Sequence, residues 1–314
     1  MAITNFIPEL WASAVQAPFE KALVFGQPSV SNTKYEGTIR NQGDTVNITT
    51  ISDPTIKSYD KNEDIDVEDL ADGQLQLVID QGDYFAFRVN DIDKVQAAGD
   101  FQGPATQRAG FGLKDKVDQF IASQFALSAD NGGPHKDNRL GDVEVINGTG
   151  TGRPGDSQTT AYNVLVDLGN KLNKQSAPSD GRYVVIDPDF LSALQHDPRF
   201  SRVDASGTSE TLRNGIVGRA AGFDILLSNN VVESSGKRLV VAGIPDALSF
   251  ANQLTEVEAL RSEKRFADII RGLNIYGSKI THPEGLATAN CEYVAAKGGN
   301  GGDDDTGGGD ESGK

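Results

Sequence analysis

The chain of 314 residues has one cysteine, Cys291, and three histidines, His135, His196 and His282. A single cysteine excludes an intrachain disulfide framework and a zinc site built on several thiolates. No two histidines have the i, i+4 or His-x-His spacing of a metal site, and no serine lies in a Gly-x-Ser-x-Gly elbow. We therefore expect no enzyme, no metal and no cofactor, and we interpret Cys291 as a small buried residue of a strand.

Basic residues are also scarce. Lys and Arg number 29 against 45 Asp and Glu, which gives a formal net charge of −16. This deficit disfavours a nucleic-acid reader with a basic footprint and adsorption to an anionic membrane. No stretch approaches the roughly 18 apolar residues of a membrane span, and the first residues lack the features of a signal peptide. Hydrophobic residues still make up 37% of the chain, so a sizeable core is expected.

Apolar residues recur at helical spacing in several segments. The predicted helices span Ala12–Phe25, which Pro18 interrupts, then Thr106–Ala129 and Thr160–Lys174. A short helix is predicted to begin at Pro188. The longest helix carries an apolar stripe of Leu113, Val117, Phe120, Ile121 and Phe125.

Period-two alternation from Tyr35 onward predicts strands. Thr45–Thr49 and Leu75–Ile79 enclose Asp60–Asp72, which holds seven carboxylates and one lysine without the spacing of a calcium loop. We interpret this as a long hairpin with a solvated acidic tip, which has little core of its own and needs a neighbour to lean on. The mixed order of elements favours the α+β class. Further strands are predicted at Phe85–Val89 (after a turn at Gln81–Asp83), Val143–Ile146, Arg182–Asp187, Phe223–Ser228, Arg238–Ala242, Glu256–Leu260, Leu273–Ile280 and Leu286–Tyr293.

Gly150–Gly155 matches the G-x-G-x-x-G pattern of a dinucleotide site and precedes a predicted helix. Pro154 removes a backbone N–H where a pyrophosphate needs donors. The next strand ends at Asp187, well beyond the roughly 20-residue spacing expected of a ribose-binding acid. We interpret the motif as a surface loop, and a nucleotide-dependent enzyme stays an alternative hypothesis.

Four segments carry a resemblance to a known family. They are Ile7–Trp11; Gly181–Pro188 with Phe190 and Leu191; Gly215–Ile225 running into Ser228 and Asn229; and Glu256–Arg261 followed by Phe266–Asp268, Arg271–Leu273, Tyr276 and Gly277. In content and order these segments resemble the major capsid proteins of tailed bacteriophages, which have the Hong Kong ninety-seven fold. The resemblance extends over nearly the whole chain.

The resemblance implies an α+β fold with an N-terminal arm, a long hairpin called the E-loop, a peripheral domain built on a spine helix, and an axial domain. The C-terminal residues are rich in glycine and acidic side chains, which predicts disorder. The expected boundaries are 1–35 for the arm, 36–92 for the E-loop, 93–158 for the peripheral domain with its spine helix at about 106–129, 159–252 for the axial domain, 253–280 for a return to the peripheral domain, 281–296 for a closing strand and 297–314 for the tail.

The resemblance also implies a structural function. It predicts an icosahedral shell of hexamers and pentamers that encloses double-stranded DNA and forms through a scaffold-dependent procapsid that expands on maturation. The implied partners are further copies of the chain, a scaffolding protein, a portal and a decoration protein, with no membrane. The implied location is the virion capsid, assembled in the host cytoplasm. An encapsulin-type cargo compartment, which has the same fold, is the alternative.

Three further expectations follow from the resemblance. Because the chain begins almost at the arm, we expect a separate scaffolding protein or a chain already processed. The net negative charge suits a DNA container, because an acidic inner wall does not grip phosphates. Subunit contacts are expected at Trp11, Phe19, Phe25, Tyr59, Asp60, Asp64 and Asp66, and a hinge at Gly99, Gly103 and Pro104.

Overall fold

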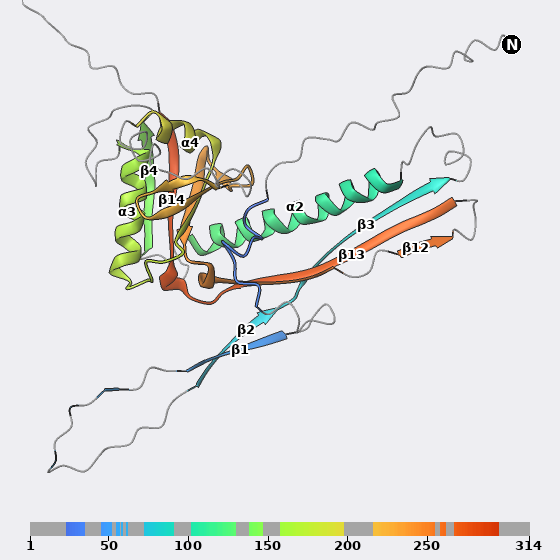
Figure 1. The fold of residues 1–314 in the computed structure, drawn as a ribbon, viewed down its shortest axis with the longest axis horizontal. Coiled ribbons are helices and arrows are strands. Elements are labelled where there is room, and N and C mark those ends of the chain that lie inside the picture. Colours follow the sequence, from blue (N-terminus) through green and yellow to red (C-terminus); the bar gives the residue numbers. More distant parts are fainter. Residues whose placement is uncertain are drawn as a thin grey trace, which may run out of the picture.

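The computed structural model describes residues 23–34, 45–51, 55–56, 58, 61, 72–90, 102–129, 138–146, 158–197, 216–254, 258–261 and 267–294. These residues form an eight-stranded sheet, a four-stranded sheet and a two-stranded hairpin, together with helices (Figure 1). Among them, no helix has both the length and the apolar character needed to cross a membrane.

The eight-stranded sheet has the order β5-β4-β14-β10-β6-β8-β7, with β9 beside β10. Its pairing joins residues that lie far apart in the chain, since β14 pairs in parallel with β4 and antiparallel with β10. The bounds are β4 Arg139–Ile146, β5 Gln158–Thr160, β6 Tyr183–Ile186, β7 Ile216–Ala220, β8 Phe223–Leu227, β9 Glu233–Ser234, β10 Lys237–Gly243 and β14 Leu286–Val294.

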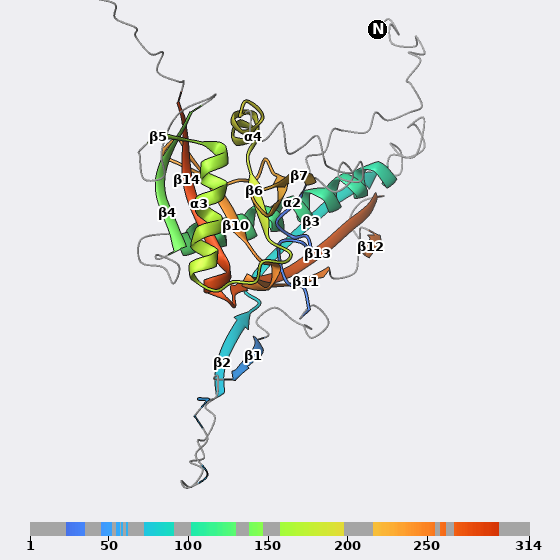
Figure 2. The ribbon, with the colours of Figure 1, turned by 60° about the vertical axis from the view of Figure 1, so that its left-hand side comes forward.

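Helices α3 (Ala161–Lys174) and α4 (Pro188–Gln195) pack against this sheet (Figure 2). Thr160 caps α3, because its side chain accepts a hydrogen bond from the Asn163 N–H. Leu165, Leu168 and Leu172 are fully buried along one face of α3, so the predicted helix and its apolar side are confirmed. Prediction and structure also agree on the start of α4 at Pro188.

The four-stranded sheet is built on β13 (Ala267–Ile280), which pairs with β3 (Gln81–Asn90) on one edge. Its other edge pairs with β11 (Leu248–Leu254) and β12 (Glu258–Arg261). Helix α2 (Gln102–Ala129) lies along one face of this sheet (Figure 1). Short 3₁₀ turns, η4 (Pro245–Ala247) and η5 (Pro283–Gly285), precede β11 and β14.

Helix α2 begins four residues before its predicted start. Gly103 and Pro104, expected in a hinge between the arm and the helix, lie in its first turn. Proline is tolerated there because the N–H groups of the first turn have no partner within the helix. Gly99, the third hinge candidate, lies outside the described residues.

The apolar stripe of α2 contacts both sheets. Val117, Ile121 and Phe125 are buried in one core with side chains of the eight-stranded sheet, such as Val185 and Val241. The same core includes Phe250 and Tyr276 of the four-stranded sheet, and the Phe120 ring meets the Tyr276 ring edge-on at 5.2 Å between centroids. The helix therefore connects the two sheets through buried apolar contacts.

The predicted hairpin is present as β1 (Thr45–Ile51) and β2 (Asp72–Val78), which pair antiparallel. The E-loop range 36–92 was too long, because β3 leaves the hairpin and joins β13. The expected turn at Gln81–Asp83 was also wrong, since these residues form the start of β3. Residues 81–83 pair with β13 like the rest of β3. The Phe85 ring packs closely on Gly272 of β13, where an added Cβ would lie 2.6 Å from the ring.

The boundary at residue 158 was wrong as well. β4 and β5 were assigned with the long helix, but they pair in the eight-stranded sheet with the predicted closing strand β14. Val145 of β4 and Cys291 of β14 are fully buried in the core beneath α3. The burial predicted for Cys291 is thereby confirmed. The expected helix Ala12–Phe25 lies mostly outside the described residues, and its last three residues are not helical.

The core beneath α3 gives a first test. Leu168→Ala should lower the free energy of unfolding by about 2–5 kcal/mol, because Leu168 is fully buried and the change leaves a cavity. Val166→Ala on the same helix is the control; Val166 is 46% exposed, so its loss should stay within about 0.5 kcal/mol. Urea unfolding measures both, and equal losses would contradict the placement of this core.

Candidate functional site

The described residues offer little to a catalytic or metal site. Among them, no three Asp, Glu, His or Cys side chains gather closely enough to hold a metal ion. His196 ends α4, with its Nδ1 2.7 Å from the Ser192 carbonyl oxygen, and the exposed His282 lies 3.0 Å from Glu284. His135 and the Gly150–Gly155 motif lie outside the described residues.

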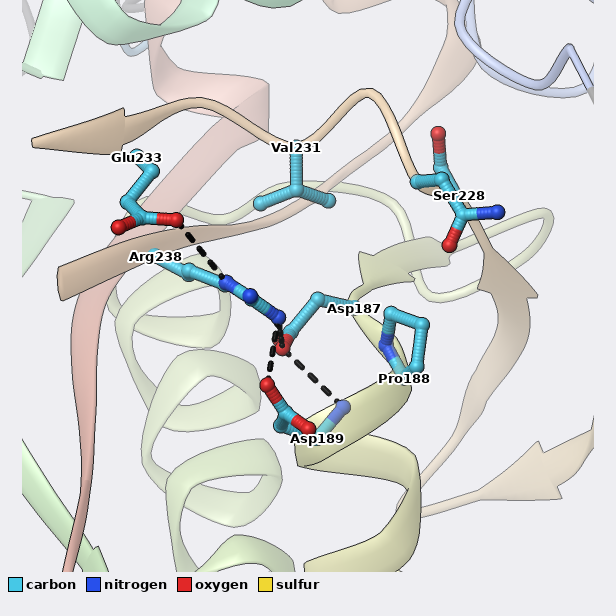
Figure 3. A pocket seen from close by; sticks show the side chains of 8 residues that line it. Asp187, Pro188, Asp189, Ser228, Val231, Glu233 and Arg238 are labelled. Atoms are coloured by element: carbon cyan, nitrogen blue, oxygen red, sulfur yellow. Dashed lines mark hydrogen bonds and ion pairs between the residues drawn. The ribbon is translucent and has the colours of Figure 1, made fainter. Parts of the chain in front are cut away.

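A pocket of about 340 Å³ lies where the parallel strands β6 and β8 end (Figure 3). Asp187 follows β6 directly and Ser228 follows β8, so the strand order places both side chains at one edge of the sheet. The pocket is lined by Asp187, Pro188, Asp189, Ser228, Asn229, Val231, Glu233 and Arg238.

Arg238 is the centre of the charge network in this pocket. Its Nη1 lies 3.0 Å from Oδ2 of Asp187 and 2.6 Å from Oδ2 of Asp189, and its Nε lies 3.5 Å from Glu233 (Figure 3). The hydroxyl of Tyr293 donates to Oδ1 of the buried Asp187. The hydrogen bond to Asp187 raises the pKa of Arg238, and burial raises the pKa of Tyr293.

The charged side chains that line this pocket therefore already have hydrogen-bond or ion-pair partners within the same chain. Asp187 also caps α4, because its Oδ2 accepts the Asp189 N–H at 3.2 Å. The Oγ of Ser228 accepts the Asn230 N–H at 3.1 Å, which fixes the turn after β8. The arrangement joins β6, α4, β10 and β14, which is a structural function.

A second buried carboxylate, Asp118, joins three segments at the side of α2. Its Oδ1 accepts the N–H of Phe25 at 2.7 Å and that of Gly26 at 3.3 Å. Its Oδ2 accepts from Nδ2 of Asn230, in the loop after β8, at 2.7 Å. Asp118 is 1% exposed, and burial raises its pKa above the usual value. The segment 23–34, the helix and the eight-stranded sheet therefore meet at one carboxylate.

Phe25 belongs to this junction rather than to a subunit contact. It is 1% exposed within the single chain, and its ring lies 5.9 Å from that of Phe125. The prediction for Phe25 was wrong, because the N–H bond to Asp118 and the apolar core hold it against α2. The other predicted contact residues, Trp11, Phe19, Tyr59, Asp60, Asp64 and Asp66, lie outside the described residues.

The four-stranded sheet also has exposed apolar side chains on the face opposite α2, beside the ion pair of Arg271 with Glu258. The base of the hairpin covers one end of this face, where Ile48 and Ile79 pack with Ile275. Further along, Leu273 lies directly opposite Tyr84 across β13 and β3, and these side chains are 40% and 75% exposed. Leu260 of β12, 42% exposed, extends the same face. Exposed apolar side chains gathered on one face are typical of a protein contact.

Comparison with known proteins decides the family. The sequence model of the phage capsid protein family matches residues 74–289. The chain belongs to this family. A solved structure from Mycobacterium phage Che8 is 30% identical, with a TM-score of 0.66, and the match covers 92% of this chain and 98% of that one. The resemblance to tailed-phage major capsid proteins and the α+β capsid fold are both confirmed.

More distant capsid structures share the fold. The capsid of cyanophage P-SCSP1u is 15% identical, with a TM-score of 0.65, and the match covers 94% of this chain and 95% of that one. The capsid of Ralstonia phage GP4 is 13% identical, with a TM-score of 0.59 and coverage of 92% and 97%. No curated protein sequence matches the chain.

The described residues contain two buried joints, at Asp187 and at Asp118, and one exposed sheet face. Sequence reasoning missed both joints and the exposed face. The alternation of Tyr84 with Phe85 and Phe87 was a usable signal, because it places the tyrosine and the phenylalanines on opposite faces of β3. Nothing in the sequence says which of these faces α2 covers.

The Asp118 joint predicts a specific pH dependence. Because burial raises the folded-state pKa of Asp118, its ionised form costs stability above that pKa, and the cost is relieved as the pH falls towards the usual value of 3.8. In the Asp118→Asn variant, the new side chain cannot titrate, and its NH₂ group faces the NH₂ group of Asn230. The free energy of unfolding of this variant should therefore be about 1–3 kcal/mol below that of the native chain. The difference in free energy of unfolding between the native chain and the Asp118→Asn variant should widen as the pH falls from 7 to 4.5. Urea unfolding at both pH values measures it, and a gap that narrows would contradict the raised pKa.

Proposed function

We propose that this phage capsid protein self-assembles into an icosahedral shell of hexamers and pentamers that encloses packaged double-stranded DNA. The observation that carries this proposal is the exposed apolar face around Tyr84 and Leu273. Burying these side chains against a second copy would remove apolar surface from water, which is favourable by up to about 1.5–3 kcal/mol for a fully exposed side chain.

In the proposed shell, a second copy of the chain covers this face with its hairpin. Within one chain, the hairpin base already rests on one end of the same face through Ile48, Leu77 and Ile79. Beyond the base, β1 and β2 pair only with each other among the described residues. A two-stranded ribbon is marginal alone, and an apolar sheet face on a neighbour supplies the missing support. Such contacts repeat around a ring, because each copy both gives a hairpin and receives one.

The details of assembly and the partners are proposed from the chain's membership of the phage capsid protein family. The solved structures of cyanophage P-SCSP1u and Ralstonia phage GP4 that share this fold are phage capsids, which supports self-association. We propose that assembly takes place in the host cytoplasm with a separate scaffolding protein and a portal, that the procapsid expands on maturation, and that a decoration protein binds the finished shell. The DNA inside is held without sequence-specific contacts, and the chain performs no catalysis.

The experiment compares two variants of the exposed apolar residues. Leu273→Asp places a buried, unpaired charge in the proposed contact, so shells should fall at least tenfold while the protein elutes as a folded monomer. Val166→Asp on α3 is the matched control, since Val166 is 46% exposed and lies on the other sheet. Size-exclusion chromatography and negative-stain electron microscopy of the chain co-expressed with its neighbouring genes count the shells.

Three outcomes would contradict parts of this account. Shells of Leu273→Asp in native yield would remove the sheet face from assembly. A native chain that stays monomeric with scaffold and portal present would overturn the shell proposal itself. Uniform shells filled with one host protein and free of DNA would favour a cargo compartment over a virion.

A further inference from the structure

The four-stranded sheet carries three rows of side chains on the face opposite α2, beyond the end that the hairpin base covers. Each row crosses β3 and β13, and two of them continue onto β12, because β13 pairs with β3 on one edge and with β12 on the other. The rows are Tyr84 and Leu273; Ala86, Arg271 and Glu258; and Arg88, Ile269 and Leu260. This outer face, defined by these residues, therefore contains arginines beside exposed apolar side chains.

Arg88 is a cation without an ion pair on the outer face. It is exposed, and no carboxylate pairs with it among the described residues. Arg271 differs, because its Nη2 lies 2.7 Å from Oε2 of Glu258. Directly opposite Arg88 is Ile269, and its diagonal neighbour on β13 is Arg271, a second cation. The outer face therefore has an excess of positive charge, although the chain has a net charge of −16.

The segment that connects the two hairpin strands has the opposite charge. Residues 60–72 hold seven carboxylates and one lysine, and neither β1 nor β2 contains a lysine or an arginine. Carboxylates concentrated in this way repel one another and are stabilised by a cation from elsewhere. An arginine suits them, because its planar guanidinium binds a carboxylate through two parallel hydrogen bonds. The segment 60–72 therefore matches Arg88 in charge and in chemistry.

The hairpin of the same chain leads away from Arg88. β1 and β2 leave the four-stranded sheet on one side, and β12, which continues the Arg88 row, lies towards the other end of that sheet (Figure 1, Figure 2). A second copy, whose hairpin covers Tyr84 and Leu273 in the proposed shell, can bring its own segment to Arg88. Tyr84 and Arg88 lie on one strand about 13 Å apart. The connection 52–71 between the hairpin strands is long enough to span about 30 Å.

We propose that Arg88 binds the acidic segment 60–72 of a second copy, and that this ion pair fixes the direction in which the neighbouring hairpin crosses the outer face. The inference rests on the proposed shell, in which that hairpin lies on Tyr84 and Leu273. Apolar contacts remove surface from water without regard to direction, whereas a charge pair favours one orientation and disfavours mismatched partners. Arg88 is therefore a specificity-determining residue of the contact between copies.

Charge reversal at Arg88 gives the first test. Arg88→Glu in the full chain, co-expressed with its neighbouring genes, should lower the yield of shells about tenfold, because a negative charge then faces the acidic segment. Lys116→Glu is the matched control and should keep the native yield. Lys116 is exposed on α2, on the other side of the sheet, and it also has no ion pair among the described residues. Both variants should melt at the temperature of the native chain, and negative-stain electron microscopy counts the shells.

A second variant tests whether the missing acid comes from this chain. Asp64→Lys, Asp66→Lys and Glu68→Lys together reverse part of the segment and should lower the yield of shells on their own. Combined with Arg88→Glu in one chain, they should restore shells to within about threefold of the native yield, because opposite charges meet again. Restoration of the yield requires that the two positions contact each other.

A cross-link shows whether the contact lies between copies. Arg88→Lys keeps the positive charge and supplies an amine, so it serves even if Arg88→Glu does not fold. A carbodiimide activates a carboxylate, and the amine displaces the resulting urea to form an amide bond. Shells assembled from equal amounts of isotope-labelled and unlabelled Arg88→Lys chains should yield mixed-isotope peptides that join position 88 to residues 60–72.

The possible outcomes separate this inference from the shell proposal. A native yield of shells from Arg88→Glu would overturn the inference and leave the shell proposal standing. Loss of shells without restoration, together with no cross-link to residues 60–72, would overturn it as well, because another protein then supplies the acid. Cross-links within one isotope alone would place the contact inside a single chain and also contradict it. A native chain that forms no shells with scaffold and portal present would overturn both proposals.

Discussion

Every other part of the structure depends on the apolar contact that α2 makes with both sheets. Val117, Ile121 and Phe125 share one buried core with strands of the eight-stranded and the four-stranded sheet. Because the helix is common to both, it fixes where the hairpin leaves the molecule and which sheet face stays open. The Asp118 carboxylate also orients the helix, because it accepts hydrogen bonds from the Phe25 N–H and the Asn230 side chain on one side of α2.

Much of the fold could be predicted from local patterns. The stripe from Leu113 to Phe125 predicted α2, and alternation predicted β1, β2 and most later strands, because burial on one side of an element leaves a periodic trace. The pairing of strands leaves no such local pattern in the sequence. The parallel contact of β4 with β14 joins residues roughly 150 positions apart, and β3 leaves the hairpin and pairs with β13, where the Phe85 ring packs on Gly272.

The contact residues were harder to predict than the fold. An acidic hairpin without a core indicated that a neighbour was needed, but Phe25 was assigned to the interface and lies in the core. An aromatic side chain in a presumed arm does not reveal whether its own helix or another subunit buries it. Likewise, Asn274 stands in an ordinary strand pattern, which does not reveal that its side chain is buried. Tertiary burial decides both cases.

The central claim is that a second copy covers the sheet face opposite α2. Cryo-electron microscopy of assembled shells, at a resolution that shows side chains, tests this claim most directly. The account predicts that the hairpin of a neighbouring subunit lies over Tyr84 and Leu273 and that both side chains are buried there. Shells in which this face is open to solvent would contradict it, whatever holds the subunits together.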